Sequence, residues 1–337
     1  MRISVLFPHA LRDRADLTAL TALASLVGTG AADRLWLGQS LAVESHQALA
    51  WLAGTGQRIP VGLSVTLTAL RHPFEAAAQA QSLAVLTGHR PVIGYGAGEP
   101  SLVGGLLGAP YARPAEAVAD YVGAVRALLD DRSAGPPAPA LGSAAPGLRL
   151  PHGEHPPAVE LGAGVLRPAM ARAAGRVADV AITWMTPPRY VAEVLVPALT
   201  EGAATTGRMA APPRPATPPR VVTVVHAAVA RPGRHPMVLA QHGAGRHLGA
   251  PHYADMLRRA GLHLDTRDPV AGARELVESG VFLYGTPDQL ATELAAYGTA
   301  GVDEVVLNPA GVVLAHGWDA ALADLTELLT HLAARAG

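Results

Sequence analysis

A run of glycines followed by an acidic residue is the first place in this sequence where a flat organic ring could bind. Gly94, Gly96 and Gly98 are spaced by two along a predicted strand and its exit, and Glu99 follows directly. The spacing does not fit the GxGxxG dinucleotide motif, because no helix opens at the third glycine. Glycine weakens a strand unless a backbone or a ligand approaches closely. Two interpretations stay open: crowding inside a narrow barrel, or a flat ring lying against the carboxyl ends of the strands.

A second run could bind an anion. Residues 158–178 are predicted to form a strand, a Gly162-Ala163-Gly164 turn and then a helix. Such a turn presents backbone N–H groups at a helix N-terminus, where the helix dipole favours negative charge. Arg167, in the first helical turn, would oppose the dipole, and a phosphate beside it would explain its place, although solvent could also hold it. These residues favour a phosphate site.

The composition excludes several other kinds of chemistry. The chain has 337 residues, 50% of them hydrophobic, no cysteine and a formal net charge of −1. Disulfides, thiolate metal sites and iron–sulfur clusters are therefore excluded, and no strong electrostatic attraction to nucleic acid or membranes is evident. None of the 14 histidines lies in an HExxH or His-x-x-x-His pair on a recognisable helix, so we expect no metal.

Strands and helices must position these residues. Eight short, mostly apolar runs have the pattern of parallel strands covered on both faces, at 3–7, 35–38, 61–67, 91–96, 158–162, 179–183, 220–229 and 304–308. Helical segments lie between them, at 16–30, 45–56, 72–88, 113–131 and 166–178. Eight strand–helix units in one chain favour a closed (β/α)₈ TIM barrel over an open sheet, with an active site at its C-terminal mouth.

Three segments interrupt this alternation. Residues 131–157 and 203–220 are rich in proline and are predicted to be surface loops. Residues 231–268 lie between the last two predicted strands and are long enough to form helices. In a barrel, such insertions after strands commonly build the active-site mouth. No internal repeat or linker is evident, so residues 1–337 are expected to form a single domain.

Residues 70–99 resemble the hallmark stretch of the luciferase-like monooxygenases and F420-dependent reductases. The matching residues are Arg71-His72-Pro73, Leu83, Leu86, Gly88, Arg90 and the glycines of 94–98. The resemblance extends to the N-terminal strand, the strand at 35–38, the turn at 162–164 and the stretch 285–307. It implies a TIM-barrel oxidoreductase that binds coenzyme F420 or FMN.

Two features resemble the F420-dependent branch in particular. Residues 62–66 resemble a strand in which F420-dependent members carry a bulge with a non-prolyl cis peptide bond, and Gly98-Glu99 resembles a strand exit where the glutamate stands at the active site. The resemblance therefore implies F420 as the cofactor, with FMN as the alternative. It implies cofactor contacts from Ser64, Val65 and Thr66 behind the ring, from Gly98, and from Leu161, Gly162, Ala163 and Gly164 at the phosphate.

The sequence departs from the family pattern just after the second strand. F420-dependent alcohol and sugar-phosphate dehydrogenases carry an acidic residue and a histidine there, but this chain has Gln39 and Ser40. An alcohol oxidation needs a base for the hydroxyl proton, and these two side chains do not supply one unaided. The departure therefore favours reduction, in which an acid supplies a proton.

Glu99 is the first candidate for that acid or for a substrate contact, although it could be an ordinary loop carboxylate. His9, after the first strand, and His72, after the third, are the other candidate acids, and each could instead be structural. His46, Trp184 and Tyr190 fall at predicted strand exits or helix starts, where pocket residues should lie. Trp184 is included among the expected cofactor-binding residues.

The predicted activity is F420H2-dependent reduction of a C=C or C=N bond, in a biosynthetic intermediate of secondary metabolism or a dehydroamino acid of a modified peptide. An FMN-dependent monooxygenase and a cofactor-binding protein without turnover are the alternatives. The short N-terminal apolar run and the absence of an 18-residue apolar stretch favour a cytoplasmic protein. The expected partners are a small-molecule or peptide substrate and, by family resemblance, a second copy in a homodimer, with no nucleic acid or membrane.

Overall fold

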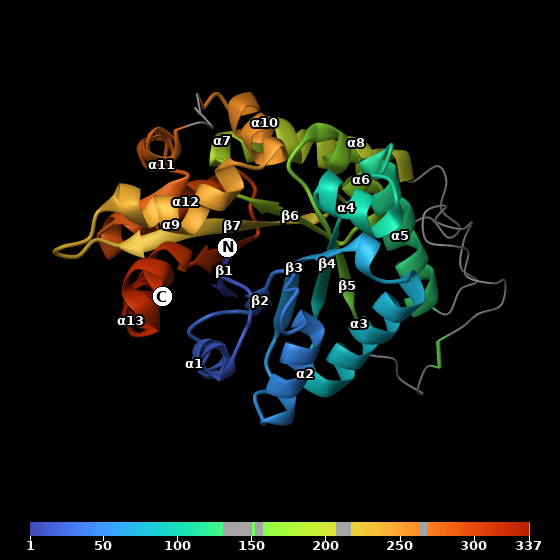
Figure 1. Ribbon diagram of the computed structural model, residues 1–337, viewed down its shortest axis with the longest axis horizontal. Helices are drawn as coiled ribbons and strands as arrows, with labels where there is room; N and C mark the ends of the chain where they lie inside the picture. Colours follow the sequence, from blue (N-terminus) through green and yellow to red (C-terminus); the bar gives the residue numbers. More distant parts are fainter. Residues whose placement is uncertain (131–149, 152–157, 207–216, 263–267, 337) are drawn as a thin grey trace. The chain divides into compact units, whose positions relative to one another are not determined.

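The chain folds as a (β/α)₈ TIM barrel (Figure 1). The computed structural model describes residues 1–130, 150–151, 158–206, 217–262 and 268–336. Its strands pair in the order β6-β5-β4-β3-β2-β1-β9-β7-β8, and a further pairing of β6 with β7 closes the sheet. This confirms the fold class that the alternating sequence pattern predicts.

The barrel wall is made of the eight strands expected from the sequence. They are β1 (Arg2–Phe7), β2 (Leu35–Leu37), β3 (Val61–Leu67), β4 (Val92–Gly96), β5 (Glu160–Gly164), β6 (Val180–Trp184), β7 (Arg220–Val229) and β9 (Glu304–Asn308). Most of their side chains are buried, as expected for strands covered on both faces.

One further strand, β8 (Phe282–Gly285), was not expected from the sequence. Strand β7 is ten residues long, so its first half pairs with β9 and its second half extends past the end of β9. The residues from His226 to Val229 pair in parallel with Phe282 to Gly285. Strand β8 therefore continues the sheet alongside β7, outside the ring of eight.

The chain divides into two compact units, and the first comprises residues 1–36, 183–194 and 221–337. Its parallel strands β1, β9 and β7 are paired in that order. Its helices are α1 (Arg14–Gly28), α7 (Pro188–Tyr190), α9 (Pro236–Leu248), α10 (Pro251–Arg259), α11 (Pro269–Glu278), α12 (Pro287–Thr299) and α13 (Ala310–Ala336), which is kinked at Gly317.

A buried carboxylate at the start of β9 organises the first unit. Glu304 is fully buried, and its Oε1 accepts hydrogen bonds from Ser4 Oγ (2.7 Å) and Trp36 Nε1 (2.8 Å). Arg2 and Arg34 lie 3.4 and 3.7 Å from the same carboxylate and supply the opposite charge. A buried charge persists only when it is paired and hydrogen-bonded in this way.

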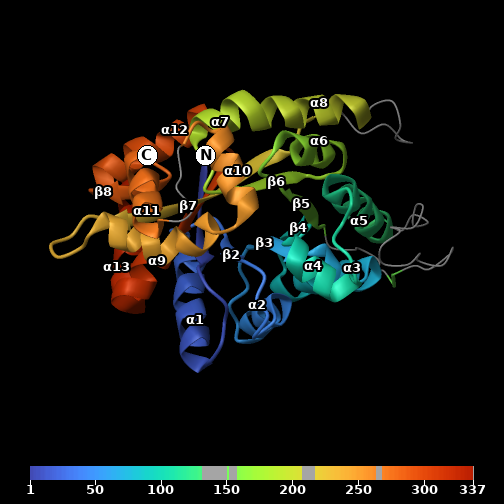
Figure 2. The ribbon, with the colours of Figure 1, turned by 45° about the horizontal axis from the view of Figure 1, so that its top comes forward.

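The second unit comprises residues 37–182 and 195–220. Strands β3, β4 and β5 are parallel neighbours within it, and α2, α3 and α5 lie along their outer side (Figure 2). Its helices are α2 (Ser45–Gly54), α3 (Pro73–Thr87), α4 (Pro100–Leu107), α5 (Pro114–Leu129), α6 (Pro168–Val177) and α8 (Val196–Thr206), with a 3₁₀ turn at Thr68–Leu70 and a π-helical turn at Val191–Leu195 that spans the boundary of the units.

Proline begins many of these helices, including α3, α4, α5 and α6. Its fixed φ suits the first helical position, and its missing N–H would have no partner there in any case. No helix among the described residues is long and apolar enough to cross a membrane.

The segments that interrupt the alternation differ in outcome. The expected loop at 131–157 lies outside the described residues except at 150 and 151. The expected loop at 203–220 begins too early, because α8 continues to Thr206, and residues 207–216 also lie outside the described part. The insertion at 231–268 does form helices, α9 and α10, which follow the carboxyl end of β7.

Candidate functional site at the carboxyl ends of the strands

The cis peptide bond expected in residues 64–66 is present between Ser64 and Val65. The register of β3 against β4 shifts between Leu63 and Thr66, so the strand also carries the expected irregularity. Ser64 and Thr66 are both buried, and Ser64 Oγ has no hydrogen-bond partner in the described residues. A buried hydroxyl without a partner is uncommon and calls for a bound group or a functional explanation.

The glycines of β4 and β5 leave room for side chains inside the barrel. Gly94 pairs with Gly162 across the two strands. A Cβ at Gly96 would lie 2.6 Å from Val65 Cγ2, and one at Gly162 would lie 2.8 Å from Ile182 Cδ1. No real Cβ tolerates such contacts, so crowding accounts for these glycines. Of the two interpretations left open above, the structure favours crowding.

The turn predicted at Gly162–Gly164 is absent, because β5 continues through Gly164. These residues pair with β6 in the sheet, from Gly162 with Val180 to Gly164 with Ile182, and do not form the first turn of a helix. The prediction that their N–H groups form a helix-terminal phosphate site is therefore wrong in its geometry. Helix α6 begins only at Pro168, with Arg167 as its N-cap and no side-chain capping bond.

Glu99, the first candidate acid, has an exposed side chain. It lies at the N-cap of α4, and its carboxylate accepts a hydrogen bond from Ser101 Oγ at 3.0 Å. Gly98, directly before it, adopts a left-handed conformation with φ of 81° that allows the chain to turn into α4.

The two histidines proposed as alternative acids occupy different surroundings. His72 caps α3, where its Nδ1 accepts a hydrogen bond from Phe74 N at 3.2 Å, so the ring has a structural role. His9 follows β1, packs against Phe7 and Trp318, and lies 3.6 Å from Asp16. Of the two, only His9 has a carboxylate partner of the kind that supports proton exchange.

A polar network that was not expected from the sequence follows β2. His46 is one of the residues predicted to line the pocket at a helix start. The structure places its Nδ1 2.9 Å from Glu44 Oε1. Arg71 Nη2 lies 3.0 Å from the same oxygen, and Arg71 also contacts Thr66 Oγ1. Thr66 Oγ1 donates to Gln39 Oε1 at 3.0 Å. The network therefore connects the exits of β2 and β3 within the second unit.

The electrostatics of this network keep Glu44 ionised. Burial alone would raise the pKa of Glu44. The hydrogen bond and charge of His46, the N–H of Gln47 and the charge of Arg71 outweigh burial and lower the pKa to about 2. His46 is only 5% exposed, and its Nε2 is buried without a hydrogen-bond partner in the described residues. A histidine held at Nδ1 by a carboxylate, with Nε2 left over, is suited to proton exchange.

Trp184 lies at the end of β6 in the first unit, beside two histidines. Its ring centroid is 5.4 Å from that of His247 on α9 and 6.2 Å from that of His226 on β7. Tyr190, the other aromatic residue expected near the pocket, is buried in α7. No group of three or more His, Asp or Glu side chains that could hold a metal occurs among the described residues.

A family model of the luciferase-like monooxygenases matches residues 1–304, which is most of the chain. The chain belongs to this family. This confirms the family that the resemblance in residues 70–99 indicated.

Curated and solved relatives of this luciferase-like protein are distant. A Mycobacterium tuberculosis protein with the provisional name coenzyme F420-dependent oxidoreductase is 29% identical over 119 residues, which cover 35% of this chain and 33% of that protein. The matched stretch thus spans about a third of the relative. The Methanopyrus kandleri coenzyme F420-dependent tetrahydromethanopterin reductase has a TM-score of 0.71 at 18% identity, covering 98% of this chain and 100% of that one.

Two further solved structures bind different cofactors on this fold. An F420-dependent secondary alcohol dehydrogenase in complex with an F420-acetone adduct has a TM-score of 0.70 at 17% identity, covering 98% of each chain. The oxygenating constituent of the Pseudomonas putida 3,6-diketocamphane monooxygenase, in complex with FMN, has a TM-score of 0.71 at 16% identity, covering 99% of this chain and 98% of that one. At these identities the likeness establishes the fold.

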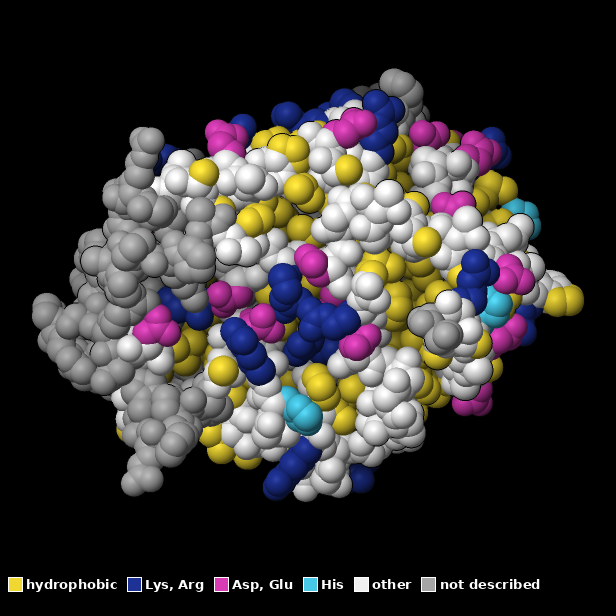
Figure 3. Space-filling view, turned by 180° about the vertical axis from the view of Figure 1, so that it is seen from behind, with side chains coloured by type: hydrophobic (Ala, Val, Ile, Leu, Met, Phe, Trp, Pro, Cys, Tyr) yellow, Lys and Arg dark blue, Asp and Glu magenta, His cyan; other side chains and the backbone are white. Residues whose placement is uncertain are grey.

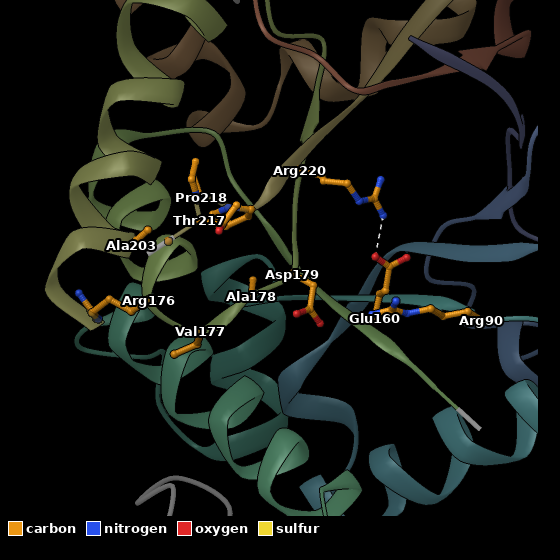
Figure 4. Close-up of a pocket in the computed structure, with 12 residues that line it drawn as sticks. Arg90, Glu160, Arg176, Val177, Ala178, Asp179, Ala203, Thr217, Pro218 and Arg220 are labelled. Carbon is orange, nitrogen blue, oxygen red and sulfur yellow. Dashed lines mark hydrogen bonds and ion pairs between the residues drawn. The ribbon is translucent and has the colours of Figure 1, made fainter. Parts of the chain in front are cut away.

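A cavity of about 260 Å³ lies at the opposite, amino ends of the strands in the second unit of this luciferase-like barrel (Figure 4). Its charged residues are paired: Arg220 Nη2 lies 2.9 Å from Glu160 Oε1, and Arg126 contacts Asp179. Arginine and acidic side chains are also intermixed on the molecular face in Figure 3. Active sites of TIM barrels lie at the carboxyl ends of the strands, so we assign these pairs to stability.

Proposed function

We propose that this luciferase-like protein is an F420H2-dependent oxidoreductase that reduces an electron-poor C=C or C=N bond. A biosynthetic intermediate or a dehydroamino acid in a modified peptide would offer such a bond. The observation that carries the proposal is His46, whose Nε2 is buried without a partner in the described residues while Glu44 holds Nδ1 at 2.9 Å. Similarity to F420-dependent oxidoreductases of the same family and fold supports the choice of cofactor.

The bulged middle part of β3 fits the ring of a deazaflavin. Ser64 Oγ is a buried hydroxyl without a partner in the described residues, next to the bulge that the ring would contact. The cofactor phosphate would bind the first turn of α6, whose N–H groups have no side-chain cap and whose N-cap is Arg167. When bound, F420H2 supplies a hydride to the substrate.

His46 would supply the proton that completes the reduction. The ionised Glu44 stabilises positive charge on the imidazole ring, and the ring can then release the proton of Nε2 toward the substrate. Arg71 and the N–H of Gln47 keep the carboxylate charged and in place. Glu44 and His46 would thus take the place of the acidic residue and histidine that family members carry where this chain has Gln39 and Ser40.

This assignment also revises the argument for reduction. A carboxylate–histidine pair can take up a proton as well as give one, so the absence of a base after β2 no longer excludes alcohol oxidation. The proposal of reduction is supported instead by the geometry of the pair, in which Glu44 holds Nδ1 and Nε2 is the ring nitrogen left to deliver a proton.

Anaerobic mixing of the protein with F420H2 and an acceptor tests the proposal. Suitable acceptors are 2-cyclohexen-1-one, a cyclic imine and a dehydroalanine ester, and the return of the visible absorbance of oxidised F420 reports turnover. We expect at least one acceptor to be reduced. No turnover with any acceptor, together with incorporation of an oxygen atom from O2 into an added substrate in the presence of reduced FMN, would establish the monooxygenase alternative.

We further propose that the protein is a homodimer formed through α2 and α3. Trp51 on α2 and Val85 and Leu86 on α3 are 42%, 63% and 43% exposed, so these two neighbouring helices offer apolar side chains that a second copy could cover. Light scattering should give the mass of a dimer, and Val85→Arg should lower it to that of a monomer.

A further inference from the structure

Three buried ring nitrogens that lack hydrogen-bond partners in the described residues lie close together in the first unit. They are Trp184 Nε1 at the end of β6, His226 Nδ1 in β7 and His247 Nδ1 in α9. The rings form one cluster, with centroids 5.4 Å apart for Trp184 and His247 and 6.2 Å apart for His226 and either of the others. A buried ring nitrogen normally has a hydrogen-bond partner. Three without one in a single cluster indicate that a molecule from outside the chain forms hydrogen bonds with them.

The hydrogen-bonding character of His226 follows from its neighbour on β9. Asn308 Oδ1 accepts from Ala310 N at 2.9 Å, so the amide orientation is set and Nδ2 faces His226 Nε2 at 3.4 Å. Because Nδ2 can only donate, Nε2 is the acceptor nitrogen of a neutral ring. The proton of His226 is therefore on Nδ1, the nitrogen without a partner in the described residues. Trp184 Nε1 is likewise a donor only.

The cluster carries no charge near neutral pH. Burial lowers the pKa of His226 to about 3, and the nearby His247 adds to the effect. Burial lowers the pKa of His247 to about 4, with His252 and Arg246 contributing in the same direction. Within the described part of the chain, no Asp or Glu forms an ion pair with any of the three rings. The three rings therefore offer no positive charge to an anionic ligand and no negative charge to a cationic one.

The backbone fixes Trp184 at the end of its strand. The next residue, Met185, has a φ of 53°, a conformation uncommon for residues other than glycine. Thr186 Oγ1 then donates to Trp184 O at 3.2 Å, so the turn is hydrogen-bonded to the tryptophan itself. The position at the carboxyl end of β6 is where a barrel places substrate contacts.

We propose that Trp184, His226 and His247 form the recognition site for the carbonyl group of an uncharged, conjugated substrate. The Trp184 and His226 N–H groups would donate to the carbonyl oxygen, and the aromatic rings would contact the flat conjugated part. This rests on the proposed reduction of an electron-poor double bond, since a carbonyl group conjugated with a C=C bond makes it electron-poor. The three residues thereby narrow the substrate class to neutral enones and unsaturated amides.

Binding of 2-cyclohexen-1-one to the cofactor-free protein, together with thermal unfolding, tests this proposal. Trp184→Phe keeps the ring and removes the donor, so affinity for the enone should fall about 3- to 10-fold, the effect of one neutral hydrogen bond. The melting temperature should stay the same or rise, because a buried donor without a partner is removed.

Trp36→Phe is the matched control. It removes a buried indole donor that does have a partner, Glu304. Its melting temperature should fall by about 2–6 °C, while enone affinity should not change.

Three results would overturn the proposal: no enone binding by the wild-type protein at millimolar concentrations, unchanged affinity in Trp184→Phe, or a loss of stability in Trp184→Phe equal to that in Trp36→Phe. The measurements use no cofactor, so they are independent of the F420 assignment. Enone binding that depends on Trp184, in a protein that does not bind F420, would refute the proposed function and leave this site in place.

Discussion

Glu44 Oε1 lies 2.9 Å from His46 Nδ1, and the opposite ring nitrogen of His46 is buried without a partner in the described residues. Both residues lie where the chain leaves β2 and enters α2, with Glu44 as the N-cap of that helix. The helix start fixes the carboxylate, because Gln47 N donates to Glu44 Oε2 at 3.1 Å. A single helix cap thus positions a histidine whose second ring nitrogen can exchange a proton.

Replacing His46 should slow turnover without loss of cofactor. We expect His46→Gln to lower kcat by about 10²–10⁴-fold, the usual contribution of a positioned general acid, while the affinity for F420 stays at the wild-type value. Glu44→Gln should cause a smaller loss and should shift the pH dependence of kcat, since the neutral amide no longer stabilises charge on His46.

His72→Asn is the control for this pair, because asparagine can still cap α3. It should retain wild-type kcat. A wild-type kcat in His46→Gln, or an equal loss of kcat in His72→Asn, would show that another residue supplies the proton. His9, beside Asp16, is then the first candidate.

The two buried histidines of the first unit should make the protein sensitive to acid. In the unfolded chain each imidazole takes up a proton near the ordinary histidine pKa of 6.5, whereas in the folded protein the pKa is about 3 for His226 and about 4 for His247. The unfolded state therefore binds more protons between about pH 6.5 and 4, and the free energy of unfolding falls as pH falls through this range.

Each histidine contributes at most about 1.4 kcal/mol per pH unit to this slope. Urea unfolding of wild-type protein and His247→Phe at a series of pH values measures it. The variant should lose less stability on acidification. Parallel curves for the two proteins would show that His247 is already protonated in the folded state.

The buried carboxylate of Glu304 should be essential for stability. Glu304→Ala removes the acceptor of Ser4 and Trp36 and leaves Arg34, itself mostly buried, without this counter-charge. Breaking a buried charge pair from one side costs about 3–5 kcal/mol. Denaturant unfolding should show a loss of this size, whereas Glu201→Ala, which breaks the exposed pair with Arg172, should cost less than about 1 kcal/mol. Similar losses in the two variants would contradict this account.

The eight strands of the barrel wall could be predicted because each is a short apolar run separated by a helical segment. Strand β8 could not, because Phe282–Gly285 is only four residues long and its pairing depends on the length of β7. The turn expected at Gly162–Gly164 failed for a related reason. The glycines at 162 and 164 predict a turn, but they lie inside the sheet, where a Cβ at Gly162 would be only 2.8 Å from Ile182 Cδ1.

The candidate site was harder to predict than the fold. Exposure of Glu99 depends on how α4 begins, which spacing along the chain does not determine. Glu44 and His46 are only two residues apart, and that proximity was a usable signal for a carboxylate–histidine pair. The partner of that pair, Arg71, comes from the exit of another strand, so its contact with Glu44 requires the folded structure.

The central claim is that this luciferase-like barrel uses F420, and titration of the cofactor-free protein with oxidised F420 and with FMN tests it most directly. Absorbance or fluorescence changes report binding, and Ser64→Ala serves as a variant in the bulged part of β3. The account predicts that F420 binds at low micromolar concentration or below, that FMN binds much more weakly, and that Ser64→Ala weakens F420 binding. Tight binding of FMN with no binding of F420 would contradict it.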